Sequence, residues 1–418
     1  MRAREAARCA RHLLWLARTR HWGIEQIRAY QRDALAAILE HAVATVPYYR
    51  ELGIGRSSLR GDDAIEAFPI LTKQLVQQHE ARLISDAHDR AGLRVSRTSG
   101  STGEPTSTFY DTDAWLLMKH ALKLRRTLSH LRLPPYRVLV IGESPASPLA
   151  GPGFPLAGVR YIAIEDGVEA HLDVIRRFRP NGIYGTPSWL LEIVQTARHL
   201  DMQLPAARTV WTSAEVLTAA ARTEIESGFG CRVRDVYGST EFKEVAVECS
   251  FGRRHVNFET SYVEVMRDHG GGPGSLLITN LVNRAMPLIR YRIGDVGELA
   301  SGPCPCGRAA PWIENIGGRE VDLIELTGGR KISPYAFSTL IETDAAIARY
   351  RLLQRSATEV EVQYQLRPGA TAADVTRLGS ALRSAAEGRL EFSFSRVDRI
   401  ERTAAGKHRI LIRSADLE

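Results

Sequence analysis

The chain has 418 residues, 44% hydrophobic and 25% charged, which is ordinary for a soluble globular protein of two or three domains. The net charge is +7, and no run of five or more like charges occurs along the chain. This even distribution of positive charge argues against a nucleic-acid binder and suits small anionic ligands. No apolar stretch approaches the roughly 20 residues of a membrane span, and the basic N-terminal run is too short in apolar residues for a signal peptide. Five cysteines argue against a secreted disulfide framework, and we expect a cytoplasmic protein.

The first 90 residues and the following 155 differ in pattern. Residues 1–60 keep helical spacing of apolar side chains up to Pro47, which interrupts the helix. From about 90 to 245, short β-rich runs alternate with helical ones, which indicates a layered α/β domain with mostly parallel strands. We expect strands at 137–144, 159–164, 181–185, 208–215 and 231–240, with helices at 171–180 and 187–200.

The remainder of the chain reads as two further regions. Residues from about 245 to 318 form a β-rich part, with strands expected at 261–266, 274–281 and 288–299. Residues 319–418 form a small α+β domain, with strands at 359–366 and 391–397 and a helix over 371–388 that Thr371 opens. The sequence therefore predicts an α/β fold with a large domain, 1–318, and a small one, 319–418.

A glycine- and hydroxyl-rich loop, "SGSTGEPT", begins at Ser99. Glycines let the backbone approach an anion, and hydroxyls with free N–H groups can line phosphate oxygens. The loop lacks the closing residues of a Walker A motif and the glycine spacing of a Rossmann motif. An ordinary surface loop is the alternative.

Three further stretches complement this loop. They are "DVYGSTE" at 235–241, "RYRIGDVGEL" at 290–299 and "RTAAGKHR" at 402–409. Tyr237 offers an aromatic face for adenine, Asp295 a carboxylate for ribose hydroxyls, and Lys407 a cation for developing charge. Singly they read as a core aromatic, a turn residue and a solvated lysine. As a set they supply what an ATP site needs.

In this combination and order, the motifs resemble the adenylate-forming superfamily of acyl- and aryl-CoA synthetases. The phenylacetate–CoA ligase branch, with its capsular-polysaccharide-biosynthesis relatives, is the most similar, and the resemblance covers nearly the whole chain. It implies that a small, compact or aromatic carboxylic acid attacks ATP-Mg to form an acyl-AMP. The small C-terminal domain then acts as a mobile lid that rotates, and coenzyme A takes the acyl group.

The resemblance also assigns residues, with two departures. Glu104 stands where the branch often has a lysine, and Val321 replaces one of two acidic hinge residues before Asp322. The implied catalytic residues are Lys407, Thr240 at the α-phosphate and Glu241 at Mg. The implied nucleotide-binding residues are Ser99, Gly100, Ser101, Thr102, Gly103, Glu215, Tyr237, Gly238, Ser239, Asp295 and Arg319.

Four residues suggest a structural metal. "CPCGR" contains Cys304 and Cys306, while Cys249 lies six residues before His255. Three thiolates and an imidazole complete a tetrahedral zinc site, and some members of the branch carry one in this region. The alternative is a pair of thiols on a loop with an unrelated cysteine.

Other functions stay open. The same adenylation could serve an amine or a carrier-protein thiol in specialised-metabolite or polysaccharide biosynthesis. A protein of another class, a non-catalytic nucleotide-binding scaffold, is disfavoured because Lys407, Glu241 and Asp295 are retained. A homodimer is left open, and the sequence does not name the acid.

Overall fold

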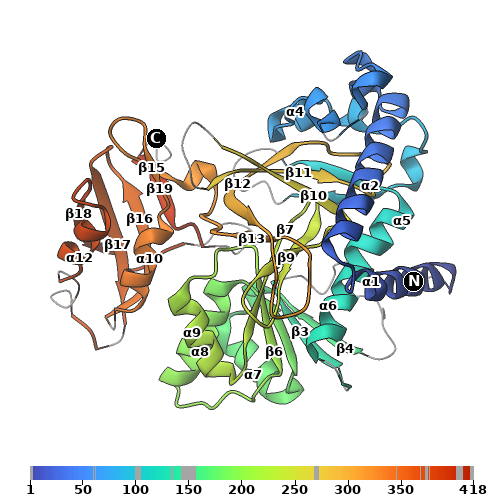
Figure 1. Ribbon diagram of the computed structural model, residues 1–418. Coiled ribbons are helices and arrows are strands. Elements are labelled where there is room, and N and C mark those ends of the chain that lie inside the picture. The colour runs from blue at the N-terminus through green and yellow to red at the C-terminus, as the bar shows by residue number, and fades with distance from the viewer. Residues whose placement is uncertain are drawn as a thin grey trace. The chain divides into compact units, whose positions relative to one another are not determined.

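The chain divides into two compact units in the computed structural model (Figure 1). Unit 1 comprises Met1–Arg137, Pro148–Gly158 and Arg234–Ile316, and unit 2 comprises Val138–Ser147, Val159–Val233 and Gly317–Glu418. The described residues are 3–59, 61, 63–98, 105–131, 133–134, 136–142, 157–267, 273–344, 346–367, 369–371, 375, 377–401 and 408–414. The predicted boundary between 318 and 319 stays a prediction.

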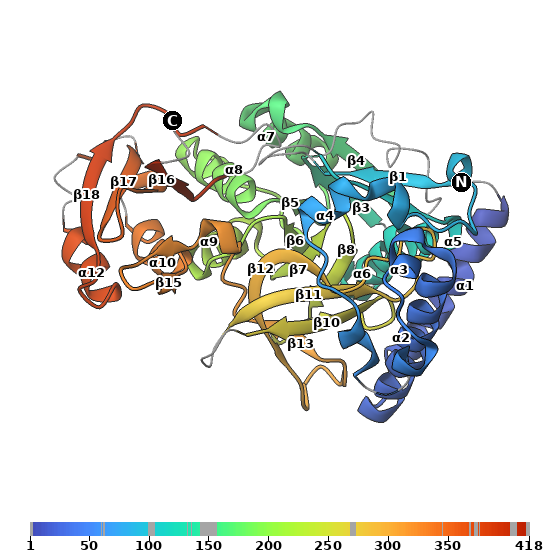
Figure 2. The same ribbon diagram turned by 90° about the horizontal axis from the view of Figure 1, so that it is seen from above.

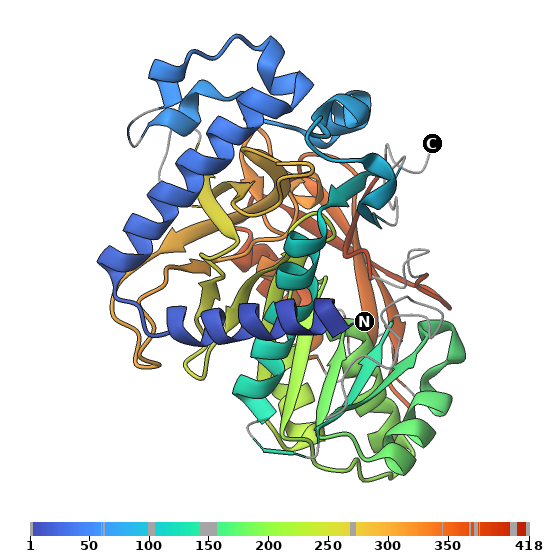
Figure 3. The same ribbon diagram turned by 90° about the vertical axis from the view of Figure 1, so that its right-hand side faces the viewer.

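Helices form the N-terminal part of unit 1 (Figure 3). Helix α2 ends at Thr45, and Pro47 begins α3, because proline fits the first turn of a helix but not its interior. The first helix packs against η5 and α6. The helices of this part are α1 (Ala3–Thr19), α2 (Ile24–Thr45), α3 (Pro47–Glu51), α4 (Lys73–Gln78), α5 (Thr112–Trp115), the π-helical η5 (Leu116–Ala121) and α6 (Leu122–Leu131).

Antiparallel strands make up the rest of unit 1 (Figure 2). A separate hairpin pairs β1 (Arg94–Arg97) with β2 (Ser107–Tyr110). The larger sheet runs in the order β10-β11-β12-β13-β9-β8-β7. Its strands are β7 (Val233–Ser239), β8 (Lys243–Glu248), β9 (Arg254–Val256), β10 (Ser261–Met266), β11 (Gly274–Asn280), β12 (Tyr291–Ala300) and β13 (Trp312–Glu314). The expected β-rich region is therefore present.

Unit 2 contains the alternating α/β part. Strand β5 pairs in parallel with both β3 and β6, as the alternation of strands and helices predicts. One apolar core holds these strands and helices α7 to α9 together. The elements are β3 (Tyr136–Ile141), β4 (Ala157–Ile162), α7 (Val168–Phe178), β5 (Gly182–Gly185), α8 (Pro187–His199), β6 (Thr209–Ser213) and α9 (Ala219–Phe229). The α/β fold class is confirmed.

The C-terminal stretch of unit 2 has a second sheet with the strand order β18-β17-β16-β19. Helices α10 and α12 contact each other and this sheet, and share one apolar core with it. The elements are β14 (Ile324–Glu325), β15 (Lys331–Ile332), α10 (Tyr335–Glu342), β16 (Ile347–Gln354), β17 (Glu359–Leu366), α12 (Leu378–Ala385), β18 (Glu391–Arg396) and β19 (Leu411–Arg413). None of the helices among the described residues has the length and apolar character that crossing a bilayer requires.

Candidate active site

Two predicted nucleotide-site residues contact each other directly. The Tyr237 hydroxyl donates a hydrogen bond to Asp295 Oδ2 at 2.8 Å. Tyr237 lies near the end of β7 and is buried, while Asp295 lies on β12 and is half-buried. An aromatic ring and a carboxylate held together in this way can serve the base and the ribose of one nucleoside.

The turn after Tyr237 requires a glycine. A Cβ atom on Gly238 would lie 1.9 Å from the carbonyl oxygen of Lys243, so any larger residue would collide with the backbone of β8. The β7–β8 register shifts at this point. Ser239 Oγ accepts hydrogen bonds from the backbone N–H groups of Glu241 and Phe242, both at 3.2 Å. The "YGSTE" segment is thus a tight, internally bonded turn.

Glu241 is buried beside two tyrosines. Tyr291 donates to Glu241 Oε1 at 3.0 Å, and Tyr110 donates to the Glu241 carbonyl at 2.5 Å. Burial, together with the Glu241 charge, raises the pKa of Tyr110 well above its usual range, so that its hydroxyl keeps its proton. A carboxylate fixed in this manner is a suitable hard oxygen ligand for Mg²⁺.

Lys243 joins the turn to the hairpin that carries the predicted phosphate loop. Its ammonium donates to the Thr240 carbonyl and to Ser96 Oγ, each at 2.6 Å. Ser96 lies on β1, and Thr98 and Thr106 close that hairpin with two hydrogen bonds, at 3.0 and 2.8 Å. The loop residues Ser99, Gly100, Ser101, Thr102 and Gly103 lie outside the described residues.

In unit 2, Glu215 caps helix α8. Its carboxylate accepts from the Ser188 backbone N–H and hydroxyl, both at 3.0 Å, at the positive end of the helix. It also accepts from the His408 backbone N–H at 2.8 Å. Lys407, the preceding residue, lies outside the described residues, and Arg319 is exposed.

The four metal-ligand candidates converge in unit 1. The ligand atoms of Cys249, His255, Cys304 and Cys306 all lie within 4.8 Å of one another. Sγ of Cys249 and Sγ of Cys304 are 3.8 Å apart, the separation of about 3.8 Å that tetrahedral Zn–S bonds give. His255 Nδ1 donates to a backbone carbonyl at 2.7 Å, which turns Nε2 toward the thiols.

The surroundings of Cys249 and Cys304 stabilise the thiolate form of each side chain. Burial raises the pKa of Cys249, yet the hydrogen bonds it receives, first from His255, shift it below its usual value overall. Backbone and thiol hydrogen bonds likewise outweigh burial and lower the pKa of Cys304. The donor set and its geometry fit zinc.

Comparison with known proteins finds adenylate-forming relatives of this chain. The model of the AMP-binding enzyme family matches residues 152–264. The phenylacetate–coenzyme A ligase of Thermus thermophilus is 25% identical over 352 residues, which cover 79% of each chain. These matches identify the chain as an adenylate-forming enzyme that is similar to the phenylacetate–coenzyme A ligases.

Two further relatives place this adenylate-forming enzyme in context. The fumarate–(S)-2,3-diaminopropanoate ligase of Enterobacter agglomerans is 26% identical over 320 residues, which cover 70% of this chain and 72% of that protein. A crystal structure of 2-hydroxyisobutyryl-CoA ligase in the postadenylation state matches with a TM-score of 0.81 at 19% identity. It covers 96% of this chain and 92% of that one, and supports the predicted fold.

The sequence interpretation missed several residues of this adenylate-forming enzyme's candidate site. Lys243 lies two residues after the end of the "YGSTE" segment, and Tyr110 lies four residues after the end of the hydroxyl-rich loop. A lysine within two residues of a glycine turn could have been noted, but nothing local shows that its ammonium reaches Ser96. Ser188 was read only as part of a helix.

Proposed function

We propose that this enzyme uses ATP to activate a small carboxylic acid and transfers the acyl group to coenzyme A. In the first step a carboxylate oxygen bonds to the α-phosphorus, and the bond to the β-phosphate oxygen breaks and releases pyrophosphate. In the second step the thiol sulfur bonds to the acyl carbon, AMP leaves, and the thiol proton is lost to solvent.

The Tyr237–Asp295 hydrogen bond is the observation that carries this proposal. In an adenylate-forming enzyme, such a pair suits adenine stacking and ribose binding. Gly238 and Ser239 shape the turn that follows, and Lys243 joins it to the base of the hydroxyl-rich loop. These contacts support a nucleotide site on unit 1.

The remaining roles extend the same proposal. Thr240 would contact the α-phosphate. The other phosphates would be bound by the loop residues Ser99, Gly100, Ser101, Thr102 and Gly103. Glu241 would hold Mg²⁺, whose charge would offset that of the phosphates. Glu215 and Arg319 would complete the nucleotide contacts, and Lys407 would meet the reacting carboxylate. Residues 319–418 would act as the lid.

A structural zinc is a further part of the proposal. Cys249 follows β8, His255 lies on β9, and Cys304 and Cys306 lie on the segment between β12 and β13. Because β13 pairs with β9, an ion held by all four would fasten neighbouring strands of unit 1. Its contribution would be to stability.

An amine acceptor is the second candidate, and one relative favours it. The fumarate–(S)-2,3-diaminopropanoate ligase is named for an acid and an amino-group-bearing partner, and it matches 70% of this chain. The overall chemistry would be the same up to the acyl-AMP. A panel of aryl and alkyl acids, assayed for pyrophosphate release, tests activation. Adding coenzyme A or amines separately distinguishes the acceptors, and no release with any acid would contradict the proposal.

A further inference from the structure

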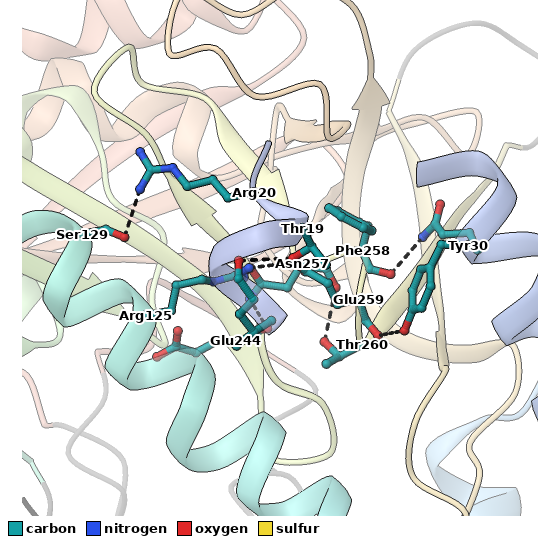
Figure 4. A network of polar contacts seen from close by, with 12 residues as sticks. Thr19, Arg20, Tyr30, Arg125, Ser129, Glu244, Asn257, Phe258, Glu259 and Thr260 are labelled. Atoms are coloured by element: carbon teal, nitrogen blue, oxygen red, sulfur yellow. Dashed lines mark hydrogen bonds and ion pairs between the residues drawn. The ribbon is translucent and has the colours of Figure 1, made fainter. Parts of the chain in front are cut away.

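A small pocket of unit 1 gathers three arginines. Arg20 follows helix α1, Arg125 lies on α6, and Arg308 lies on the segment between β12 and β13. Thr19 and Glu259 also line this pocket. Figure 4 shows Arg20, Arg125, Thr19 and Glu259 with their hydrogen bonds.

Within the described part of the chain, one of the three guanidinium groups has a carboxylate partner in an ion pair. Arg125 Nη1 donates to Glu259 Oε1 at 2.6 Å, and Thr19 donates to the same oxygen at 2.6 Å. Arg20 donates to the neutral Ser129 hydroxyl at 3.3 Å. Among the described residues, no carboxylate forms an ion pair with the Arg308 guanidinium, although the charge of Glu259 acts on it. Two positive charges in the pocket are therefore uncompensated.

A neighbouring histidine reports the same excess of positive charge. Burial is the main cause that lowers the pKa of His130 to about 3, followed by the charges of Arg126 and Arg234 and then by those of Arg308 and Arg20. His130 is thus neutral at pH 7. Arg20 is exposed, but Arg308 is half-buried, and like charges held together with reduced access to water are costly unless an anion lies between them.

We propose that this pocket binds a phosphate-type oxyanion. Arginine forks match the oxygens of phosphate, and the charge of a phosphate dianion equals the two uncompensated cations. The pocket is partly open and leaves about 20 Å³ for the centres of bound atoms, which is room for the oxygens of one phosphate group and not for a whole nucleotide. It therefore admits only one small group, which enters from the solvent side, where Arg20 is exposed.

Phosphate titration of the full-length, metal-replete protein tests the pocket. Thermal stability is followed in sodium phosphate and in sodium chloride of equal ionic strength. The matched variants are Arg20→Gln, Arg308→Gln and, as control, Arg28→Gln, an exposed arginine of α2. Phosphate should stabilise the parent and Arg28→Gln equally, and its apparent dissociation constant should rise at least about tenfold in both pocket variants.

The variants also separate this pocket from its surroundings. A response to phosphate at the nucleotide site would be the same in all four proteins. Because Arg308 lies near Cys306, the zinc content of each protein is measured as a control. If Arg308→Gln loses metal, the comparison of the parent with Arg20→Gln alone tests the pocket. Equal phosphate affinity in the parent and Arg20→Gln would overturn the proposal, as would a parent that responds alike to phosphate and chloride.

The anion could be free or part of a larger molecule. On the proposed function, coenzyme A supplies a phosphomonoester that dephospho-coenzyme A lacks. If the pocket holds that group, the parent will prefer coenzyme A and Arg20→Gln will not. If the pocket holds free phosphate, Arg20→Gln will weaken phosphate binding and leave the preference unchanged. If the enzyme activated no acid, the phosphate titration would still test the pocket, because it measures thermal stability and not activity.

Discussion

The Tyr237 hydroxyl lies 2.8 Å from Asp295 Oδ2, although the two residues belong to strands that are far apart in the sheet. Strands β13, β9 and β8 lie between β12 and β7 in the sheet order of unit 1. With neighbouring strands about 4.8 Å apart, a flat sheet could not bring them together. The curvature of this sheet therefore joins an aromatic side chain to a carboxylate.

The first prediction concerns ribose recognition by Asp295. Asp295→Ala should weaken ATP binding by about 2–3 kcal/mol, because it removes hydrogen bonds to a charged group. The parent should discriminate against 2′-deoxy-ATP, whereas the variant should not. Calorimetric titration with both nucleotides checks this.

Tyr237→Phe is the matched control for that measurement. It keeps the ring and removes only the hydroxyl that Asp295 accepts from, so it should cost about 1 kcal/mol of ATP affinity and retain discrimination. If the parent and Asp295→Ala used 2′-deoxy-ATP equally well, Asp295 would not bind ribose.

The second prediction concerns zinc. Purified protein should contain about one zinc ion per chain, because four ligand atoms converge with suitable geometry. Cys304→Ser should lower both the zinc content and the thermal midpoint. Cys231→Ser, which changes a cysteine outside the cluster, should lower neither. Protein prepared without chelators and found free of zinc by metal analysis would end this assignment.

The third prediction is a pH dependence set by Glu342. Burial raises the pKa of this α10 carboxyl to about 7, although it accepts hydrogen bonds from Thr218 and Tyr350. The folded protein thus holds a proton that the unfolded chain loses near pH 4.5. The free energy of unfolding should therefore fall as pH rises from about 4.5 to 7, by on the order of 2–3 kcal/mol.

Urea unfolding at several pH values measures this dependence. Glu342→Gln should remove that part of the slope, since glutamine does not titrate. Glu169→Gln, at an exposed position of α7, should leave it in place. An unchanged pH profile in Glu342→Gln would show that the carboxyl titrates near its usual value.

Local periodicity predicted the fold well, and the site only in parts. Strict alternation predicted β17, and the β-type pattern "SYVEVM" at 261–266 predicted β10, at the residues where both strands occur. The strand expected at 208–215 ends earlier, because Ala214 adopts a positive φ of 71°. Because the periodicity of a strand depends on residues that are neighbours in the chain, strand positions can be predicted from the sequence.

Long-range contacts were not readable in the same way. Tyr237 and Asp295 were each assigned to a nucleotide site, but their direct hydrogen bond spans 58 residues and depends on sheet curvature. Glu215 was assigned to the nucleotide, whereas its contacts in the described residues are with Ser188 and His408. Only tertiary packing gives a carboxylate such partners.

The most direct test of acid activation is ATP–pyrophosphate exchange by Lys407→Ala. A single preorganised donor at the reacting phosphate is worth about 10²–10³ in rate, so exchange should fall by that factor. The dissociation constant for ATP should change by less than about tenfold, because the large domain would supply most nucleotide contacts. The variant should still convert a supplied acyl-AMP and coenzyme A to thioester.

The control is Lys331→Ala, which changes an exposed lysine of the same C-terminal stretch and should exchange normally. An acid panel with no exchange in the parent, or a Lys407→Ala variant that exchanges at the parental rate, would contradict the account.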